Sequence, residues 1–498
     1  MKQTTLIFVL ILILAIFLRL NLILPGNIIL GFDQYRDLFQ AKDILVNGDI
    51  KIIGPTAGNN AGLHHGVGFW YLLSFLMFFS KNPISISALL SLFNILALAA
   101  VYFLSKKLFN DNKKSLTVAL LSAVSIGWIQ YSGWISNPVI TFLTVPLFFL
   151  FLFEYRNGRP KNLVLAAFFL GLSIQFELFM LYLIPVAGIL FLALRMKFPN
   201  FKTIIFSILS FCFAISSLIL TEIKFKGAGV LSLFSAGSKV GGQGSENRLL
   251  NTFDRLADIF TQNLIPQNMN LSKIIAVIII FILFVSLFRN FKSKENRDKY
   301  LFLIIYLFSP FTMLVLGYHS APWFLIGSFG AVVLSITEVL SLLKPRWLSI
   351  FAVIVIVVNL INFNLQNNSA YLLEPDRSSI LKTQLSVAKY TFTSSNNNSF
   401  TINSLTNPLY INYSWSYLYP LFSNKKMPTF SGGDQLEPFS TLEKQTGNEK
   451  YLYLLIDKTN RIPSRYMNEL INWSDKKSIL VETVDFDGIL VQKRLLWN

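Results

Sequence analysis

A polar loop that follows the first long apolar segment offers the clearest chemistry in this sequence. Asp33 lies a few residues beyond the apolar stretch that ends at Leu24. A carboxylate at that position faces the headgroup layer of a bilayer, where it can reach a polar substrate beside the membrane. A second interpretation stays open, because residues 33–45 are typical of an amphipathic helix and Asp33 fits its N-cap.

All three histidines of the chain, His64, His65 and His319, are predicted to fall on this same side of the membrane. Imidazoles beside one polar loop can hydrogen-bond a phosphate, either in the neutral form or as the protonated cation. A zinc site of three histidines is conceivable, but no two of them stand at ligand spacing on one helix, so we predict no metal. A simple interfacial position is the plainer interpretation of each.

Other polar residues are predicted within a turn or two of the same surface. Glu177 interrupts the apolar run LGLSIQFELFMLYLIP, which makes it a functional candidate unless it only forms the turn between two spans. Arg19 interrupts the first apolar segment, and we predict that its side chain extends outward to the interface. The remaining candidates for substrate binding are Gln34, Tyr131, Asn137 and Tyr318.

The elements that must position these residues are more apolar than those of soluble proteins. The chain has 498 residues, of which 53% are hydrophobic, only 14% are charged and 47 are Phe. Apolar runs long enough to cross a hydrocarbon core of roughly 30 Å recur until about residue 363 and then cease. We predict about eleven spans, at residues 5–24, 84–105, 116–135, 138–153, 162–179, 181–195, 203–221, 271–289, 300–317, 322–343 and 347–364.

The placement of basic residues predicts the orientation of these spans. The net charge of +17 comes mainly from Lys and Arg in short loops between apolar runs, a pattern that indicates topology and argues against nucleic acid as a partner. With the N-terminus inside, these loops face the cytoplasm. Residues 66–80 are apolar but short, so we predict an interfacial or re-entrant helix on the outer face. An ordinary short span is the alternative.

Three stretches are therefore predicted on the outer face, at 25–83, at 222–270 and after residue 365. Long loops of this kind tend to carry function. Residues 227–247 are rich in Gly and polar side chains, which is typical of a lid that orders on substrate binding or of a plain connector.

The last quarter of the chain is predicted to be a separate, soluble α/β domain. Short β-rich runs occur at 399–402, 451–456 and 488–492, and a helical pattern occurs at 379–390. This segment contains no phosphate loop, dinucleotide fingerprint or Cys/His cluster, so we expect no independent chemistry in it.

These features together resemble the GT-C fold glycosyltransferases, in particular the protein mannosyltransferase and aminoarabinose transferase branch (glycosyltransferase family 39 and relatives). The motifs that carry the resemblance are GFDQY at 31–35, NGD at 47–49, HHGVGFWY at 64–71 and YSGWISNP at 131–138. The family has a second acid after the Asp of the first outer loop, where this chain has Gln34. It also has Lys or Arg before the aromatic run, where this chain has His64 and His65.

The resemblance implies an all-α polytopic membrane domain with outer-face interfacial helices over residues 1–365, followed by an extracytoplasmic α/β domain over residues 366–498. It implies a plasma (inner) membrane enzyme that moves a sugar from a polyprenyl phosphate to an acceptor hydroxyl on the outer face, with inversion. Asp33 would be the general base, and His64, His65 and His319 would hold the donor phosphate, with no cofactor required. The partners would be the lipid-linked donor, the bilayer and an acceptor protein, lipid or polysaccharide.

A transporter or flippase of lipid-linked glycans is the alternative from another functional class. Such a protein is expected to show internal repeats and ionisable residues near the middle of the membrane. Neither feature is clear in this sequence. A membrane-anchored binding module that only displays its C-terminal domain does not account for so many spans.

Overall fold

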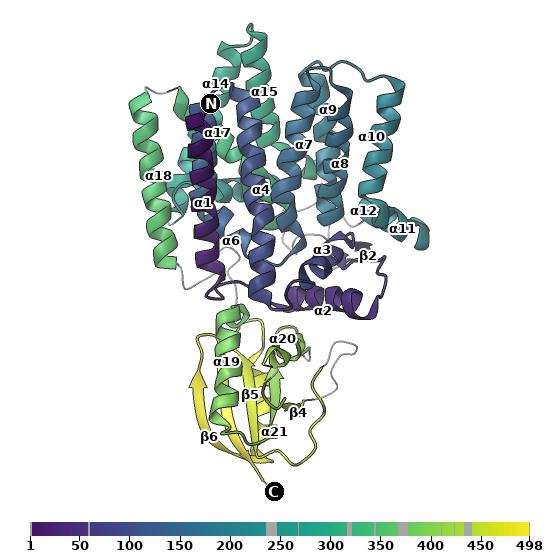
Figure 1. Cartoon of the computed structure of the whole chain (residues 1–498), viewed down its shortest axis with the longest axis vertical. Coiled ribbons are helices and arrows are strands. Elements are labelled where there is room, and N and C mark those ends of the chain that lie inside the picture. The colour runs from purple at the N-terminus through teal and green to yellow at the C-terminus, as the bar shows by residue number, and fades with distance from the viewer. Residues whose placement is uncertain are drawn as a thin grey trace.

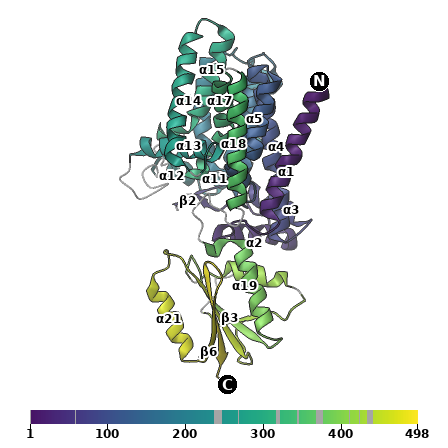
Figure 2. The same ribbon diagram turned by 90° about the vertical axis from the view of Figure 1, so that its left-hand side faces the viewer.

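The structure is a computed structural model in which a bundle of long helices stands on a smaller domain built around a sheet (Figure 1). It describes residues 2–57, 60–235, 247–266, 268–315, 321–342, 345–366, 377–409, 411–422, 424–432 and 441–497. We call the helices α1 to α18 the membrane domain and the residues from 377 onward the C-terminal domain. The end of the bundle beside the C-terminal domain is the domain-facing end, and the opposite end is the distal end (Figures 1 and 2).

Five helices of the described residues are long and apolar enough to cross a membrane. They are α1 (Lys2–Ile23), α4 (Pro83–Phe109), the pair η1 (Asn137–Ile140) and α7 (Thr141–Tyr155), α14 (Met269–Arg289), and the pair η5 (Pro322–Ser328) and α17 (Phe329–Ser341). Two bent pairs raise this number to seven if each pair is one span, namely α5 (Asn112–Val124) with α6 (Ile126–Ser132) and α10 (Phe201–Ala214) with α11 (Ser216–Lys224). A multi-span helical membrane domain is therefore confirmed, whereas the count of eleven stays a prediction.

The other helices of the membrane domain are shorter or more polar. They are α2 (Phe32–Asn47), α3 (Gly68–Met77), α8 (Pro160–Phe176), η2 (Leu178–Tyr182), α9 (Leu183–Ala193), α12 (Ala228–Ser235), α13 (Arg248–Asn263), α15 (Lys294–Leu307), η4 (Ser309–Phe311), α16 (Thr312–Val315) and α18 (Pro345–Gln366). With α3 only 10 residues long, its length of about 15 Å is half of a hydrocarbon core. This length supports the prediction that residues 66–80 do not cross the membrane.

The span predicted at 116–135 is broken rather than continuous. The axes of α5 and α6 differ by 57°, and the break falls at Ser125. Backbone groups freed inside a membrane need new partners, and Asn359 on α18 provides one of them. Its Oδ1 accepts from the Ile126 N–H at the break (3.2 Å), while its Nδ2 donates to the Leu264 carbonyl at the end of α13 (3.1 Å). The break therefore depends on a side chain 233 residues further along the chain.

Arg19 does not extend outward to the interface, so that prediction is wrong. Its side chain is fully buried, and its Nε donates to the Asn94 Oδ1 on α4 (2.8 Å). Its terminal nitrogens donate to the carbonyls of Ala123 (3.1 Å) and Ser122 (3.5 Å) in the last turn of α5. The guanidinium thus satisfies carbonyls that the break after α5 leaves without helical partners, and it ties α1 to α4 and α5.

At the distal end, buried carboxylates are surrounded by cations. The Glu338 side chain on α17 is 1% exposed and lies between Lys114 on α5 (2.8 Å) and Lys299 on α15 (2.7 Å). Asp298 on α15 pairs with Arg156 (3.3 Å), which follows α7, and with Arg297 (2.9 Å). These ion pairs join four helices where the basic loops are predicted to face the cytoplasm.

The C-terminal domain has a mixed five-stranded sheet between helices, which confirms the predicted α/β character of the tail. The strands are β3 (Phe400–Leu405), β4 (Thr429–Phe430), β5 (Tyr451–Asp457), β6 (Ser478–Asp485) and β7 (Ile489–Leu496), in the order β4-β3-β5-β7-β6. β3 is parallel to β4 and β5, whereas β7 is antiparallel to β5 and β6. The helices are α19 (Leu381–Ser394), α20 (Tyr413–Leu418) and α21 (Ser464–Asp475), with short turns η6 (Arg377–Ser379) and η7 (Tyr419–Leu421).

Candidate functional site

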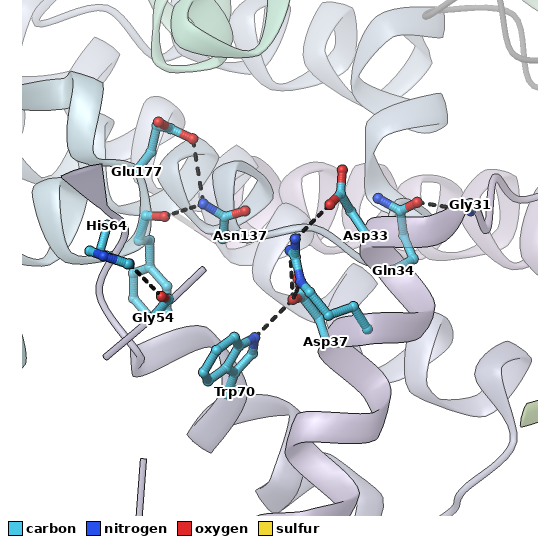
Figure 3. Close-up of polar contacts among 11 residues, drawn as sticks. Gly31, Asp33, Gln34, Asp37, Gly54, His64, Trp70, Asn137 and Glu177 are labelled. Atoms are coloured by element: carbon cyan, nitrogen blue, oxygen red, sulfur yellow. Dashed lines mark hydrogen bonds and ion pairs between the residues drawn. The ribbon is translucent and has the colours of Figure 1, made fainter. Parts of the chain in front are cut away.

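The candidate site lies at the domain-facing end, where α2 and a short hairpin meet the ends of α7 and α8 (Figures 1 and 3). The hairpin consists of β1 (Thr56–Ala57) and β2 (Asn60–His64), which are antiparallel. It leads directly into α3, and Gly66 lies so close to Gln175 near the end of α8 that an added Cβ would meet the Gln175 side chain at 2.4 Å. The glycine in the HHGVG motif therefore lets the hairpin approach α8 closely.

Asp33 lies in the first turn of α2, and its carboxylate is largely exposed to solvent. The N-cap of the helix is Gly31 and not Asp33, because the Gln34 Oε1 accepts from the Gly31 N–H (2.9 Å). The Asp33 side chain is 63% exposed, and a negative charge in a first turn interacts favourably with the helix dipole. Asp33 is thus free to meet a ligand, whereas Gln34, predicted to bind substrate, is buried and engaged in shaping the helix start.

Arg36 holds the carboxylate of Asp33, and Asp37 holds Arg36 in turn. Neither Arg36 nor Asp37 was predicted as a site residue. The Arg36 Nη1 lies 2.6 Å from the Asp33 Oδ1, and its Nη2 and Nε donate to the Asp37 Oδ1 (2.8 and 3.0 Å). The Asp37 side chain is only 3% exposed, and its Oδ1 also accepts from the Trp70 Nε1 (2.8 Å) on α3. Figure 3 shows this chain of contacts from Trp70 through Asp37 to Asp33.

The electrostatic effects on Asp37 oppose one another. Burial raises its pKa, whereas the Arg36 cation and the hydrogen bond from Trp70 lower it, and the net pKa lies above the usual value. The pKa of Arg36 is lowered by burial and raised more by Asp37 and Asp33, so the guanidinium stays charged. Acids four residues apart with an Arg beside them share one helix face, and this spacing was the signal available in the sequence.

His65 lies on the other side of the site, against the junction of α8 and η2. Its Nδ1 accepts from the Leu178 N–H (3.4 Å) and lies 3.6 Å from the Glu177 Oε1. Burial lowers the pKa of His65 to about 3, with further lowering by the charges of Arg36 and His64. The imidazole is therefore neutral near pH 7, and with Nδ1 as an acceptor its proton resides on Nε2. Of the two forms predicted for phosphate binding, the structure favours the neutral one.

Glu177 is both the end of α8 and part of this junction. Its carboxylate accepts from the Phe179 N–H (3.4 Å) and from the Asn137 Nδ2 (3.5 Å), and that Asn137 nitrogen also donates to the Phe176 carbonyl (2.6 Å). Two predicted site residues, Asn137 and Glu177, are thus brought together with His65. Glu177 therefore forms the predicted turn and also lies beside His65, and its functional role stays a prediction.

His64, Tyr131 and the remaining predicted residues are placed differently. The His64 Nδ1 lies 3.0 Å from the Gly54 carbonyl, and its ring stacks on Phe225, which follows α11 (5.7 Å between centroids). Tyr131 is buried among aromatic rings that include Trp134. Tyr318 and His319 lie outside the described residues, so their prediction is not tested.

Two further predictions fall in this region. The lid predicted at 227–247 overlaps α12, but residues 236–246 lie outside the described part of the chain, and the lid stays a prediction. Within the described ranges no group of three or more His, Cys, Asp or Glu is arranged to hold a metal ion.

Comparison with known proteins places this architecture. No family model and no curated protein matches the chain. Its fold is nevertheless that of the GT-C glycosyltransferases. Two crystal structures of ArnT from Cupriavidus metallidurans superpose on it at 9% sequence identity. The apo structure covers 99% of this chain and 98% of ArnT with a TM-score of 0.61, and the structure bound to undecaprenyl phosphate covers 98% and 97% with a TM-score of 0.62. The predicted resemblance is confirmed at the level of the fold.

Proposed function

We propose that this protein is a membrane glycosyltransferase that moves a sugar from a polyprenyl phosphate to an acceptor hydroxyl on the extracytoplasmic face. The observation that carries the proposal is the ArnT-like fold of the whole chain, together with an exposed, ion-paired Asp33 at the end of the bundle where a lipid-linked sugar would emerge. One of the two similar ArnT structures is bound to undecaprenyl phosphate. The enzyme would lie in the plasma (inner) membrane with its C-terminal domain outside.

Asp33 is the proposed general base. The acceptor hydroxyl attacks the anomeric carbon from the face opposite the phosphate while Asp33 takes its proton, so a single displacement inverts that carbon. Arg36 holds the Asp33 carboxylate from one side, and Asp37 and Trp70 hold Arg36 in turn. A base fixed in this way loses little freedom when the substrate arrives.

The departing phosphate needs charge stabilisation more than it needs a proton. The neutral His65 offers its Nε2–H as a donor, because the Leu178 N–H occupies its Nδ1. His64 and His319 are proposed as further donors to the phosphate, with Asn137 and Glu177 supporting His65 from behind. Tyr131, Gln34 and Tyr318 are proposed to contribute to substrate binding through the walls of the site. No metal or nucleotide enters this sequence of steps.

The test is the transfer activity of Asp33→Asn in proteoliposomes that contain the full-length protein. A panel of labelled polyprenyl-phosphate sugars is offered together with membrane extract as the acceptor source. Removal of the base is expected to lower the transfer rate by about a hundredfold or more. Asp43→Asn is the matched control, since Asp43 lies on the same helix but pairs with Lys51 (2.6 Å) instead of Arg36.

Two outcomes would contradict the proposal. Full activity in Asp33→Asn would remove Asp33 from the role of base. Movement of the labelled lipid between leaflets by the wild-type protein, without any new glycoside, would identify a flippase.

A further inference from the structure

The C-terminal domain contacts the candidate site directly at the chain segment that leads into α2. Three backbone hydrogen bonds join the two: the Leu30 N–H to the Ser379 carbonyl (2.7 Å), the Leu381 N–H to the Ile28 carbonyl (3.0 Å) and the Lys382 N–H to the Gly26 carbonyl (2.9 Å). Gly26 has a φ of 83°, and an added Cβ there would meet the Lys382 backbone at 3.3 Å. The start of α19 and the approach to α2 therefore pair as two short antiparallel segments.

One side chain of α19 reaches past this pairing into the first turn of α2. The Gln384 side chain is buried, and the residue is 5% exposed. Its Nε2 donates to the carbonyls of Leu30 (3.1 Å) and Ser378 (2.9 Å), and its Oε1 accepts from the Tyr35 hydroxyl (2.5 Å). Both hydrogens of the amide and its oxygen are thus engaged.

Two of the groups that Gln384 contacts, the Leu30 carbonyl and the Tyr35 hydroxyl, belong to residues before and after the proposed base in the chain. Leu30 immediately precedes the N-cap, and the Tyr35 N–H makes the first hydrogen bond of the helix, to the Gly31 carbonyl (3.2 Å). Asp33 lies between them in the same turn. A first turn ordinarily frays because its N–H groups lack helical partners, and the Gln384 amide clamps this turn at both ends.

Aromatic side chains of α20 pack against the same face of α2. Tyr413 of α20 stacks on Phe32 (5.2 Å between centroids) and lies edge-on to Phe39 (5.9 Å). The Tyr417 hydroxyl donates to the Lys81 carbonyl (2.8 Å), beyond α3. The opposite side of α2 is held by the hydrogen bond from Trp70 to Asp37. Rotation of α2 about its axis would break contacts on both sides.

We infer that the C-terminal domain sets the position of the catalytic helix and that Gln384 is the positioning residue for Asp33. The inference rests on the proposed function for its kinetic consequence, but the physical claim concerns the order of the first turn of α2 alone. Without the Gln384 amide, the turn loses its clamp, and the Asp33 carboxylate leaves its place beside Arg36. A base displaced by about 1 Å can lose on the order of a hundredfold in rate.

The experiment compares Gln384→Ala with Ser386→Ala in the full-length protein in lipid nanodiscs. Ser386 lies on the same helix at an exposed position, and its hydroxyl donates to the carbonyl of Lys382 (2.8 Å). Amide hydrogen exchange of residues 26–36 is measured first, because it needs no donor. We expect exchange in this segment to accelerate about tenfold or more in Gln384→Ala and to stay at the wild-type rate in Ser386→Ala.

Transfer kinetics are measured second, with whichever lipid-linked donor the wild-type protein uses. Gln384→Ala is expected to lower kcat about tenfold or more with little change in KM for the donor, whose proposed contacts lie in the membrane domain. Gln384→Glu keeps the acceptor for the Tyr35 hydroxyl, but its carboxylate cannot donate to the carbonyls of Leu30 and Ser378, so kcat should fall at least as far as in Gln384→Ala. Wild-type exchange rates outside residues 26–36 in both variants would exclude a general defect in folding.

The results separate two kinds of failure. Wild-type exchange rates in Gln384→Ala would overturn the inference whatever the activity, and so would faster exchange with unchanged kcat. A wild-type protein that transfers no sugar would instead overturn the proposed function, while the exchange measurement still decides whether Gln384 orders the first turn of α2.

Discussion

Asp33 at the domain-facing end and the acidic residues at the distal end lie in opposite surroundings. At the distal end, Glu338 is buried and has a lysine on each carboxylate oxygen, and Asp298 is buried between two arginines. At the domain-facing end, Asp33 is exposed and shares one arginine with Asp37. Fully compensated ion pairs hold helices together, whereas a carboxylate left open to solvent can still act on a ligand.

The largest loss of stability is expected from a substitution in the buried ion pairs at the distal end. Glu338→Gln leaves Lys114 and Lys299 in a partly buried place without their counter-charge, which should lower the free energy of unfolding by about 3 kcal/mol. Glu154→Gln is the control, because Glu154 pairs with the half-exposed Lys107 (3.1 Å) and should cost less than about 1 kcal/mol. Thermal melting in detergent measures both.

Retention of wild-type stability in Glu338→Gln would contradict the view that the distal cluster is structural. The transfer rate per folded molecule is expected to remain close to that of the wild type in Glu338→Gln. Asp33→Asn should have the opposite effects: its melting temperature should stay close to that of the wild type, and its rate of sugar transfer should fall.

A second effect, of intermediate size, is a pH dependence of the free energy of unfolding that His65 at the domain-facing end should cause. The pKa of His65 is lowered from 6.5 to about 3 in the folded protein, so on acidification the unfolded chain takes up this proton first. The free energy of unfolding should therefore be unaffected by His65 above about pH 6.5 and should fall by about 2 kcal/mol by pH 5. His65→Gln should lose this part of the pH dependence of the melting temperature. Identical pH profiles for the two proteins would show that His65 protonates as readily in the folded state.

The smallest effect concerns the support behind Arg36. Trp70→Phe keeps an aromatic ring on α3 but removes the hydrogen bond to the buried Asp37 carboxylate, which should cost about 1.5 kcal/mol. Trp134→Phe offers a comparison, since it makes the same substitution away from Asp37, and both proteins are melted under the same conditions. Equal losses in the two variants would mean that only ring volume matters at position 70.

The general architecture was predictable because it depends on local composition. Apolar runs, basic loops and the change of character after residue 365 each arise from neighbouring residues, and the β-rich runs at 399–402 and 451–456 fall on β3 and β5. The position of Asp33 at the start of an amphipathic helix also follows from adjacent residues. Motifs of a few letters were sufficient for the GT-C resemblance, although only 9% of residues are identical to ArnT.

The partners of individual side chains were not predictable, because they come from distant parts of the chain. Nothing near Asp37 indicates that Trp70 will donate to it, and so Arg36 and Asp37 have the sequence pattern of an ordinary solvated helix face. The break at Ser125 comes two residues before Gly127, but nothing in this segment indicates that the Ile126 N–H will be satisfied by Asn359. Arg19 was assigned to the interface because snorkelling needs no partner, whereas its actual partners lie 75 and 104 residues away.

The burial of Arg19 makes α1 more than a membrane-targeting element. A generic hydrophobic leader in its place would still direct the chain into the bilayer, but it would bring no guanidinium to the Asn94 amide and the two carbonyls at the end of α5. Chimaeras with foreign signal anchors should therefore insert and then pack poorly around the broken span. The guanidinium of α1 thus joins this helix to the end of α5 through contacts that an apolar side chain cannot make.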